Sequence, residues 1–279
     1  MTCRLLKFVA IDLWGACQST AIALVATLLL VGITSVSAQD SEAMQRGLAA
    51  MQRGNFVVAE NAFRDALRNH PRDAHAWKAL GVSFAARGIH DAASEPFLRA
   101  CTLDAHEPDA CYYLARNHYL LNRFAESLAL FDRLSEQAKG DWRYANGRGL
   151  ALLALNRYGE AELAFRRAMD LERDQSSLDE NPAVNLGNLF ARAGEPDKAA
   201  AVLRSVVKQH PEAARAWFEL GKAEVQLGRL NDAESSLKSA LTARPAYREA
   251  HLLLSKVYTR LGKPEQAREH RAQGLAIAQ

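Results

Sequence analysis

The sequence predicts an all-α fold made of repeated pairs of helices. The segment Ala76-Trp77-Lys78-Ala79-Leu80-Gly81 returns in similar form at residues 216–221. The two tryptophans are 140 residues apart, which equals four periods of about 34 residues with about four residues left over. Apolar residues also recur three and four apart over about a dozen residues in each period, which is the pattern of one buried helical stripe.

The repeat can be followed along the chain because small and aromatic residues return at the same offsets. Downstream of Gly81 lie Phe84, Gly88, Ala93 and Phe97, and related residues recur in every period. The frame predicts seven repeats after residue 39, with a polar insertion at 176–179 that accounts for the four extra residues. The predicted repeats are 40–73, 74–107, 108–141, 142–175, 180–213, 214–247 and 248–279.

Each repeat should contain a first helix, a short break and a second helix. Residues that tolerate a left-handed backbone mark the breaks, and they are Gly54, Gly88, Asn122, Asn156, Gly194, Gly228 and Gly262. Small residues such as Gly81 and Ala93 would let the two helices of a pair approach closely. Large residues such as Phe97 and Leu203 would fill the space toward the neighbouring repeat, so stacking of the pairs would supply the core.

These positions resemble the tetratricopeptide repeat family, whose pattern is Trp-x-x-Leu-Gly-x-x-Tyr, then Ala-x-x-x-Phe, then Pro. The resemblance covers the chain beyond residue 39. The sequence departs from the pattern where the tryptophan is replaced by Ala43, Cys111, Ala145, Ala183 and His251. The resemblance implies a right-handed superhelical solenoid of helix-turn-helix repeats, in which Trp77 and Trp217 are packing residues.

The N-terminus has the pattern of an export signal. Arg4 and Lys7 precede an uncharged stretch, and small residues suggest cleavage after Ala38. Residues 1–38 are therefore expected to be a signal peptide, or alternatively an uncleaved anchor, because residues 19–38 are uncharged and long enough to span a bilayer. Either alternative predicts an extracytoplasmic array, periplasmic or secreted, or anchored to the inner membrane by 19–38.

Composition and motifs argue against catalysis, cofactors and nucleic-acid binding. The net charge is only +3, without the concentrated basic footprint that nucleic acids require. The chain has no nucleophile elbow, phosphate-binding glycine loop or His-Glu-x-x-His motif. The carboxylate pair Glu219 and Glu224 is expected to be exposed and solvated. We therefore predict no enzyme activity, no cofactor, and a membrane contact only through an uncleaved N-terminal segment.

Two cysteines outside the presumptive signal, Cys101 and Cys111, lie on consecutive antiparallel helices that a short turn would bring together. They could form a disulfide in an exported protein, or remain two buried thiols that act as small apolar residues. His106 lies between them, but three groups with no fourth ligand do not make a standard zinc site. We predict no metal site.

The remaining function is partner binding. In the family that the chain resembles, first helices line a concave groove that holds an extended peptide or a partner helix. The positions carried over by offset are mostly basic, with aromatic residues among them, which favours acidic, partly apolar partners. The predicted groove residues are Lys78, Tyr112, Arg116, Tyr119, Arg143, Arg192, Arg215, Phe218, Lys222, Lys256 and Arg260.

The sequence thus predicts an exported scaffold that binds acidic protein or peptide segments. The alternative is a binding module for an acidic cell-envelope polysaccharide. A carboxylate clamp pairs Lys and Asn four residues apart on a first helix. It is absent because the residue four positions after Lys78 is Val82 and the residue four positions before Asn188 is Val184.

Overall fold

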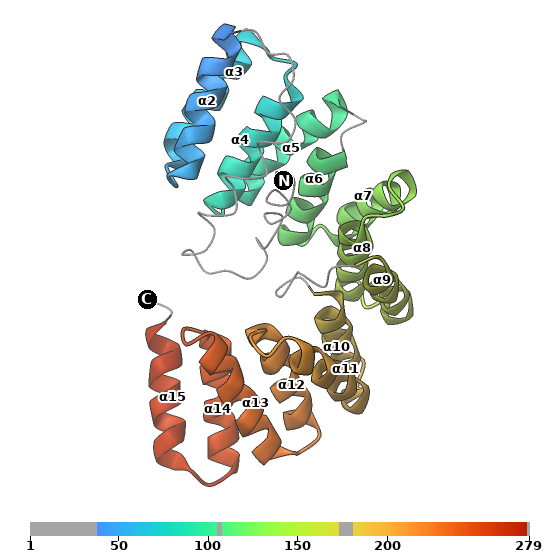
Figure 1. The fold of residues 1–279 in the computed structure, drawn as a ribbon, viewed down its shortest axis with the longest axis vertical. Coiled ribbons are helices and arrows are strands. Elements are labelled where there is room, and N and C mark those ends of the chain that lie inside the picture. Colours follow the sequence, from blue (N-terminus) through green and yellow to red (C-terminus); the bar gives the residue numbers. More distant parts are fainter. Residues whose placement is uncertain (1–37, 105–107, 173–180, 278–279) are drawn as a thin grey trace, which may run out of the picture. The chain divides into compact units, whose positions relative to one another are not determined.

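A computed structural model describes residues 38–104, 108–172 and 181–277, and side chains from Glu42 onward. Within those ranges the chain is entirely helical, as predicted, and forms fourteen α-helices (Figure 1). They are α2 (Ala38–Gln52), α3 (Phe56–Asn69), α4 (Ala74–Ala86), α5 (His90–Leu103), α6 (Pro108–Leu120), α7 (Phe124–Gln137), α8 (Trp142–Ala154), α9 (Tyr158–Leu171), α10 (Pro182–Arg192), α11 (Pro196–Gln209), α12 (Ala214–Gln226), α13 (Leu230–Ala243), α14 (Arg248–Arg260) and α15 (Pro264–Ala276).

The chain divides after Asn156 into two compact units. The N-terminal unit contains α2 to α8 and the C-terminal unit contains α9 to α15. In both units the helices pack in sequential pairs, such as α4 on α5 and α12 on α13, and each second helix also packs on the next first helix. Neighbouring first helices touch as well, α4 with α6 and α10 with α12. First helices therefore lie together on one side of each unit.

The predicted breaks between first and second helices are confirmed. Asn122 and Asn156 have φ of 58° and are the non-glycine residues with positive φ in the described chain. The five glycines named above have φ between 71° and 80°. At the first break, the Gly54 amide donates to the Met51 carbonyl at 2.9 Å and the Asn55 amide to Ala50 at 2.8 Å. The left-handed residue thus ends the helix and satisfies its last carbonyls.

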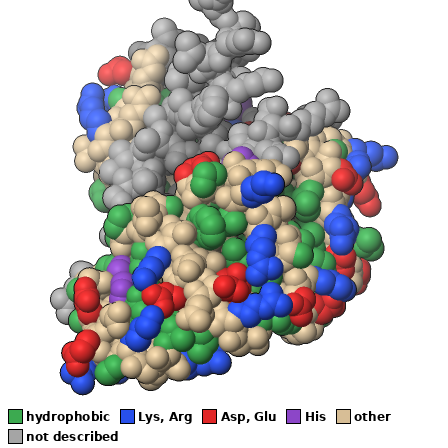
Figure 2. Space-filling view, turned by 60° about the horizontal axis from the view of Figure 1, so that its bottom comes forward, with side chains coloured by type: hydrophobic (Ala, Val, Ile, Leu, Met, Phe, Trp, Pro, Cys, Tyr) green, Lys and Arg blue, Asp and Glu red, His purple; other side chains and the backbone are tan. Residues whose placement is uncertain are grey.

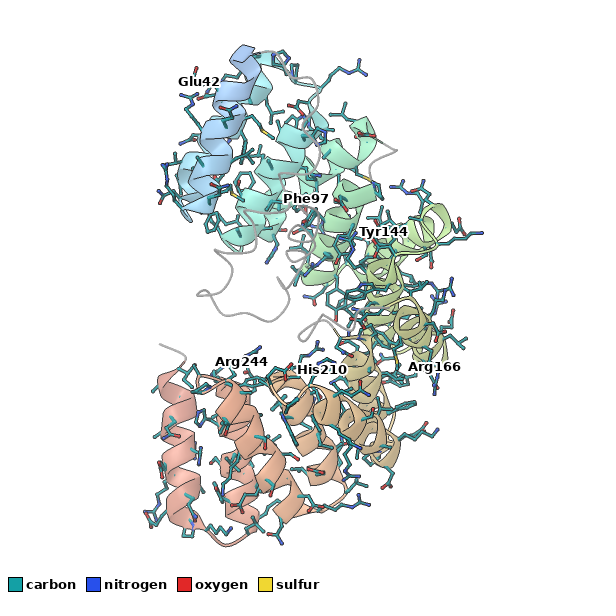
Figure 3. All side chains as sticks on the ribbon, viewed as in Figure 1. Glu42, Phe97, Tyr144, Arg166, His210 and Arg244 are labelled. Carbon is teal, nitrogen blue, oxygen red and sulfur yellow. A yellow bond between two sulfur atoms is a disulfide. The ribbon has the colours of Figure 1, made fainter. Side chains whose placement is uncertain are left out.

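Glycines on the first helices allow the close approach that the sequence predicted. A Cβ added to Gly81 would lie 2.6 Å from the ring of Phe97, which Figure 3 labels on α5, and one added to Gly187 would lie 2.5 Å from Leu203 Cγ. Such distances are far inside van der Waals contact, so a side chain at these positions would force its neighbour to move. A Cβ added to Gly147 would instead lie 2.3 Å from the ring of Phe131 on the preceding helix, so this ring fills the space toward the next pair.

Trp77 and Trp217 are confirmed as packing residues, and each makes the same hydrogen bond. Both are partly buried against a hydrophobic cluster. The Trp77 Nε1–H group donates to the Pro71 carbonyl at 2.9 Å and that of Trp217 to Pro211 at 2.8 Å. His251 occupies the equivalent position in the last repeat, and its Nε2 lies 2.9 Å from the Pro245 carbonyl. A ring N–H therefore joins three first helices to the proline turn before them.

Several sequence predictions fall on residues outside the described ranges. Of the expected signal peptide or anchor at residues 1–38, residues 1–37 lie outside the described ranges, and the predicted cleavage point follows Ala38, the first residue of α2. The insertion at 176–179 and His106 also lie outside. Among the described helices, none combines the length and hydrophobicity that crossing a bilayer requires.

Candidate functional site

The predicted groove residues are distributed over both units. These residues make up the first-helix face, which lies on α4, α6 and α8 in the N-terminal unit and on α10, α12 and α14 in the C-terminal unit.

In the N-terminal unit the face centres on Tyr112, which is buried with 6% of its surface exposed. Arg116, one turn along α6, donates to the Tyr112 hydroxyl at 3.2 Å and lies over its ring. From α8, the Arg143 guanidinium lies 5.2 Å from the Tyr112 ring centroid and 5.7 Å from that of Tyr144. Tyr144 is labelled in Figure 3. The aromatic residues and arginines therefore form one packed cluster between α6 and α8.

Arg143 is neutralised within this cluster. Asp141 caps α8 by accepting from the Arg143 amide at 2.9 Å, and it accepts from the Arg143 Nε at 3.0 Å as well. Asp109 of α6 lies 3.7 Å from the same guanidinium. Burial alone would lower the pKa of Arg143, but the Asp141 carboxylate outweighs it and raises that pKa. Burial, with Asp141, also raises the pKa of the Tyr144 hydroxyl to about 12.

Two other predicted positions in this unit are buried or half-buried. Lys78 is only 9% exposed, so the expectation of an open cationic contact there is wrong. The reason is its place on α4, whose neighbouring residues Ala79, Leu80 and Val82 are also buried. Tyr119 is half-buried and meets the ring of Phe124 edge-on at 5.3 Å.

In the C-terminal unit, polar and charged groups of α10 and α12 bind one another. Arg215 donates to the Asn185 side-chain oxygen at 2.6 Å. Lys222 and Asn188 both donate to Glu219 Oε2, at 2.7 and 2.9 Å. Glu219 thus compensates the charge of Lys222, and the predicted cation at this position is not free.

The same unit has an aromatic pair beside these groups. Phe218 of α12 lies 5.0 Å from the ring of Tyr247, the residue preceding α14, and Lys222 lies over the Phe218 ring at 5.5 Å. Burial raises the pKa of the Tyr247 hydroxyl above its ordinary value, and Glu219 adds to this shift.

The expectation that Glu219 and Glu224 are exposed is wrong. Glu219 is 6% and Glu224 is 3% exposed. Glu224 accepts from Ser236 of α13 at 2.7 Å and from Arg204 of α11 at 3.1 Å. Sequence spacing suggested a solvated pair, but a buried carboxylate is retained where neighbouring donors satisfy it, and the donors to Glu224 come from other helices.

The exposed cations of the face lie elsewhere in the C-terminal unit. Lys256 and Arg260 are exposed on α14, and neither forms an ion pair with a described side chain; Arg260 lies 3.5 Å from the Val225 carbonyl. Arg192 is exposed at the end of α10. These three residues retain the outward exposure that the sequence predicted for the whole set.

The predicted surplus of basic charge is therefore smaller than sequence offsets indicated. On the face drawn in Figure 2, Lys and Arg side chains alternate with Asp and Glu around hydrophobic areas. The predicted set contains only the outward positions of the first helices, and Asp141 and Glu219 lie outside that stripe. Asp141 could have been found as the residue before a helix start, where Asp is a preferred cap. The contact between Lys222 and Glu219 is an i,i+3 pair on α12 that the spacing could have indicated, whereas the contact from Asn188 depends on tertiary packing.

Cys101 and Cys111 are joined by a disulfide in the structure, with their Cα atoms 4.7 Å apart. The bond links the end of α5 to the beginning of α6. From α7, Arg133 Nη2 lies 3.1 Å from each sulfur. Among the described residues no group of three or more metal-ligating side chains comes together.

The comparison with protein families matches most of the chain. The family described as Tetratricopeptide repeat matches residues 44–108, 112–176 and 184–247, and a second description with the same name matches 224–279. These matches extend through the pairs of helices in both units.

Individual relatives and solved structures are more distant. Over 194 residues, 64% of this chain, the sequence is 29% identical to Cellulose synthase operon protein C of Xanthomonas axonopodis pv. citri, and it covers 12% of that protein. It is 24% identical over 161 residues, 58% of this chain, to Superkiller complex protein 3 of Mus musculus, and covers 10% of it. The chain therefore spans only a small part of each of these relatives.

A solved structure shows the same fold over nearly the whole chain. It is a tetratricopeptide repeat protein from Parabacteroides merdae, with a TM-score of 0.74 and 15% identity, and the alignment covers 87% of this chain and 94% of that one. The similarity at this identity concerns the fold, and it agrees with the sequence matches. The chain belongs to the tetratricopeptide repeat family.

Proposed function

We propose that this protein is an exported interaction scaffold that binds acidic, partly apolar protein segments on its first-helix face. Tetratricopeptide repeat proteins mediate protein–protein interaction, and the described fold consists of such helix pairs. On this proposal the protein acts by binding and not by catalysis. The basic, apolar and small-residue pattern of residues 1–38 supports export.

One observation carries the choice of an acidic partner. Lys256 and Arg260 are exposed on α14, and no acidic side chain in the described part of the chain pairs with them, whereas Arg143 and Lys222 are neutralised internally. Unpaired surface cations attract an acidic segment and speed its encounter with the face. Phe218 and Tyr247 lie on the neighbouring helix and turn, where they offer apolar contact. We therefore propose that the C-terminal unit makes the principal acidic contact.

Affinity capture tests this proposal. The intact protein is immobilised and exposed to envelope extract at low and at high salt, beside a Lys256→Glu/Arg260→Glu variant. We expect a defined protein to be retained at low salt, less of it at high salt because exposed charges are screened, and about tenfold or greater loss in the variant. Lys256→Glu alone should lose part of the binding, and it leaves the Arg260 contact to α12 intact.

The control is Lys208→Glu/Arg271→Glu. Both residues are exposed and lie on second helices, α11 and α15, so this variant changes net charge equally without touching the first-helix face. Equal loss in the two double variants would show a nonspecific charge effect and contradict the proposal. Retention of anionic polysaccharide alone would favour the alternative, a binding module for an acidic cell-envelope polymer.

A further inference from the structure

The disulfide region contains a feature that partner binding does not explain. Arg133 extends from α7 to the bond between Cys101 and Cys111, and its Nη2 lies 3.1 Å from both sulfurs. The two cysteines are buried, whereas Arg133 is exposed. A guanidinium gains little from a neutral disulfide, but it stabilises a thiolate strongly. The contact would therefore become more favourable after reduction of the bond.

The two sulfurs differ in their helical environment. Cys111 lies near the N-terminus of α6 (Pro108–Leu120), where the helix dipole favours negative charge. Cys101 lies near the C-terminus of α5 (His90–Leu103), where the dipole opposes it. Arg133 contacts both sulfurs, so the helix ends decide which one becomes the more acidic thiol. That thiol is Cys111.

Acidic groups near the site act in the opposite direction. Asp104 caps the end of α5, and Asp109 lies in the first turn of α6. Asp109, however, is 3.7 Å from the Arg143 guanidinium, which compensates part of its charge. Among the described residues, the charged side chain that contacts the sulfurs directly is that of Arg133.

We propose that the Cys101–Cys111 disulfide is a redox-sensitive clasp, in which Arg133 and the start of α6 stabilise the Cys111 thiolate released on reduction. One thiolate of a dithiol reductant attacks the Cys101 sulfur, and Cys111 leaves as the thiolate. The second thiol of the reductant then attacks the mixed disulfide, releases Cys101 as a thiol and closes the reductant into a cyclic disulfide. The proton of the second thiol passes to Cys101, and two electrons pass from the dithiol to the protein disulfide.

The clasp connects the second pair of helices to the third. Cys111 is followed directly by Tyr112, which packs under Arg116 and Arg143. Reduction removes the covalent tie between α5 and α6 and leaves the first turns of α6 held by packing alone. The redox state thus controls local order at the first-helix face of the N-terminal unit. This inference concerns the N-terminal unit and does not depend on the partner proposed for α14.

The first test uses the full chain and peptide mass spectrometry. In unreduced, denatured protein, we expect Cys101 and Cys111 to resist alkylation until a reductant is added. In reduced, folded protein, we expect the alkylation rate of Cys111 to reach half its maximum at a pH below about 8.5, the pKa of an ordinary thiol. This half-maximal pH should also be lower for Cys111 than for Cys101. Alkylation of both cysteines without reductant would overturn the proposal.

The second test separates Arg133 from a purely structural role. Arg133→Gln should raise the pH of half-maximal Cys111 alkylation and shift the equilibrium with glutathione toward the disulfide by about three- to tenfold. Arg133→Lys keeps the charge and should restore part of both effects. Arg99→Gln is the matched control, because Arg99 binds Glu95 on α5 and does not contact the sulfurs. Circular dichroism checks that each variant is folded, and identical behaviour of Arg133→Gln and Arg99→Gln would overturn the proposal.

Hydrogen exchange then tests the structural consequence. On reduction, amides in the first turns of α6 should exchange about tenfold or more faster, because a cross-link between adjacent helices no longer limits local opening. Amides of α12 to α15 should be unchanged. Equal exchange of α6 in the oxidised and reduced proteins would refute the control of local order.

Discussion

At the scale of single residues, His251 stands where other repeats have tryptophan, and it keeps the hydrogen bond of that tryptophan while making a second one. Its Nε2 faces the Pro245 carbonyl, which accepts only, so Nε2 carries the proton. In the neutral ring Nδ1 then accepts, and the His270 Nδ1 at 2.9 Å must donate to it. The tryptophans at the same position in other repeats make only the first of these bonds. Histidine therefore joins α14 to α15 through one ordered proton.

The His251–His270 contact predicts acid sensitivity in the last helix pair. Burial lowers the pKa of His270, and the proximity of His251 and Lys238 lowers it further, while Glu269 opposes the shift. The unfolded chain thus binds more protons than the folded one below the ordinary histidine value of about 6.5, so stability falls as pH drops through that value and continues to fall until the depressed folded pKa is passed. Thermal unfolding midpoints between neutral pH and pH of about 5 measure the effect.

The matched variant for this prediction is His270→Gln, which retains a donor but does not titrate. Its unfolding midpoint should decline less with falling pH than that of the unchanged protein. His118, whose pKa is lowered by burial and by Arg123, keeps part of the slope in both. Parallel pH curves for the two proteins would contradict the assignment.

At the scale of helices, close contact between a first-helix glycine and a large second-helix residue determines how tightly a pair packs. In Gly81→Ala the new methyl group would meet the Phe97 ring at 2.6 Å, and relieving such overpacking costs about 1–3 kcal/mol. Alanine recovers up to about 1 kcal/mol through helix propensity. We expect a net loss of roughly 1 kcal/mol, measured as a lower denaturant midpoint.

Gly159→Ala is the control for that substitution. Gly159 is exposed on α9, and a Cβ there meets nothing within 4 Å. The same change should therefore stabilise the protein by about 0.5–1 kcal/mol. If Gly81→Ala stabilised it equally, the close contact with Phe97 would not limit packing.

Neighbouring first helices are also tied at their ends. Gln226 of α12 donates to the Ala191 carbonyl of α10 at 3.3 Å, and Arg260 of α14 reaches the Val225 carbonyl of α12 at 3.5 Å. The two pairs are each separated by 35 residues. A side chain from one repeat therefore helps to satisfy the last carbonyls of the preceding first helix, which have no partner within that helix.

At the scale of the whole molecule, the fold could be predicted more fully than the site. The breaks at Asn122 and Gly228 and the contact of Gly81 with Phe97 depend on residues whose spacing is visible in one period. The charge of the face depends on short-range ion pairs of Arg143 with Asp141 and of Lys222 with Glu219. Arg143 and Lys222 looked like free cations because the carboxylates that neutralise them, Asp141 and Glu219, lie outside the stripe of positions used to choose them.

The disulfide could be predicted only in part. The sequence placed Cys101 and Cys111 on adjacent helices and left two alternatives, a bond or two buried thiols, and in the structure the two cysteines are bonded. Nothing in the spacing indicated Arg133, which is 22 residues beyond Cys111 and reaches back from the next helix. Local periodicity therefore predicts which backbones meet, whereas the chemistry of the meeting point depends on side chains from a third element.

We propose that partners bind the first helices of the C-terminal unit. The decisive measurement is hydrogen exchange of the intact protein, alone and saturated with the protein retained in the capture experiment. We predict slower exchange in α12 and α14 in the complex, no change in α11 and α15, and loss of this protection in Lys256→Glu/Arg260→Glu. Protection confined to the second helices, or unchanged in that variant, would show that partners do not bind these first helices.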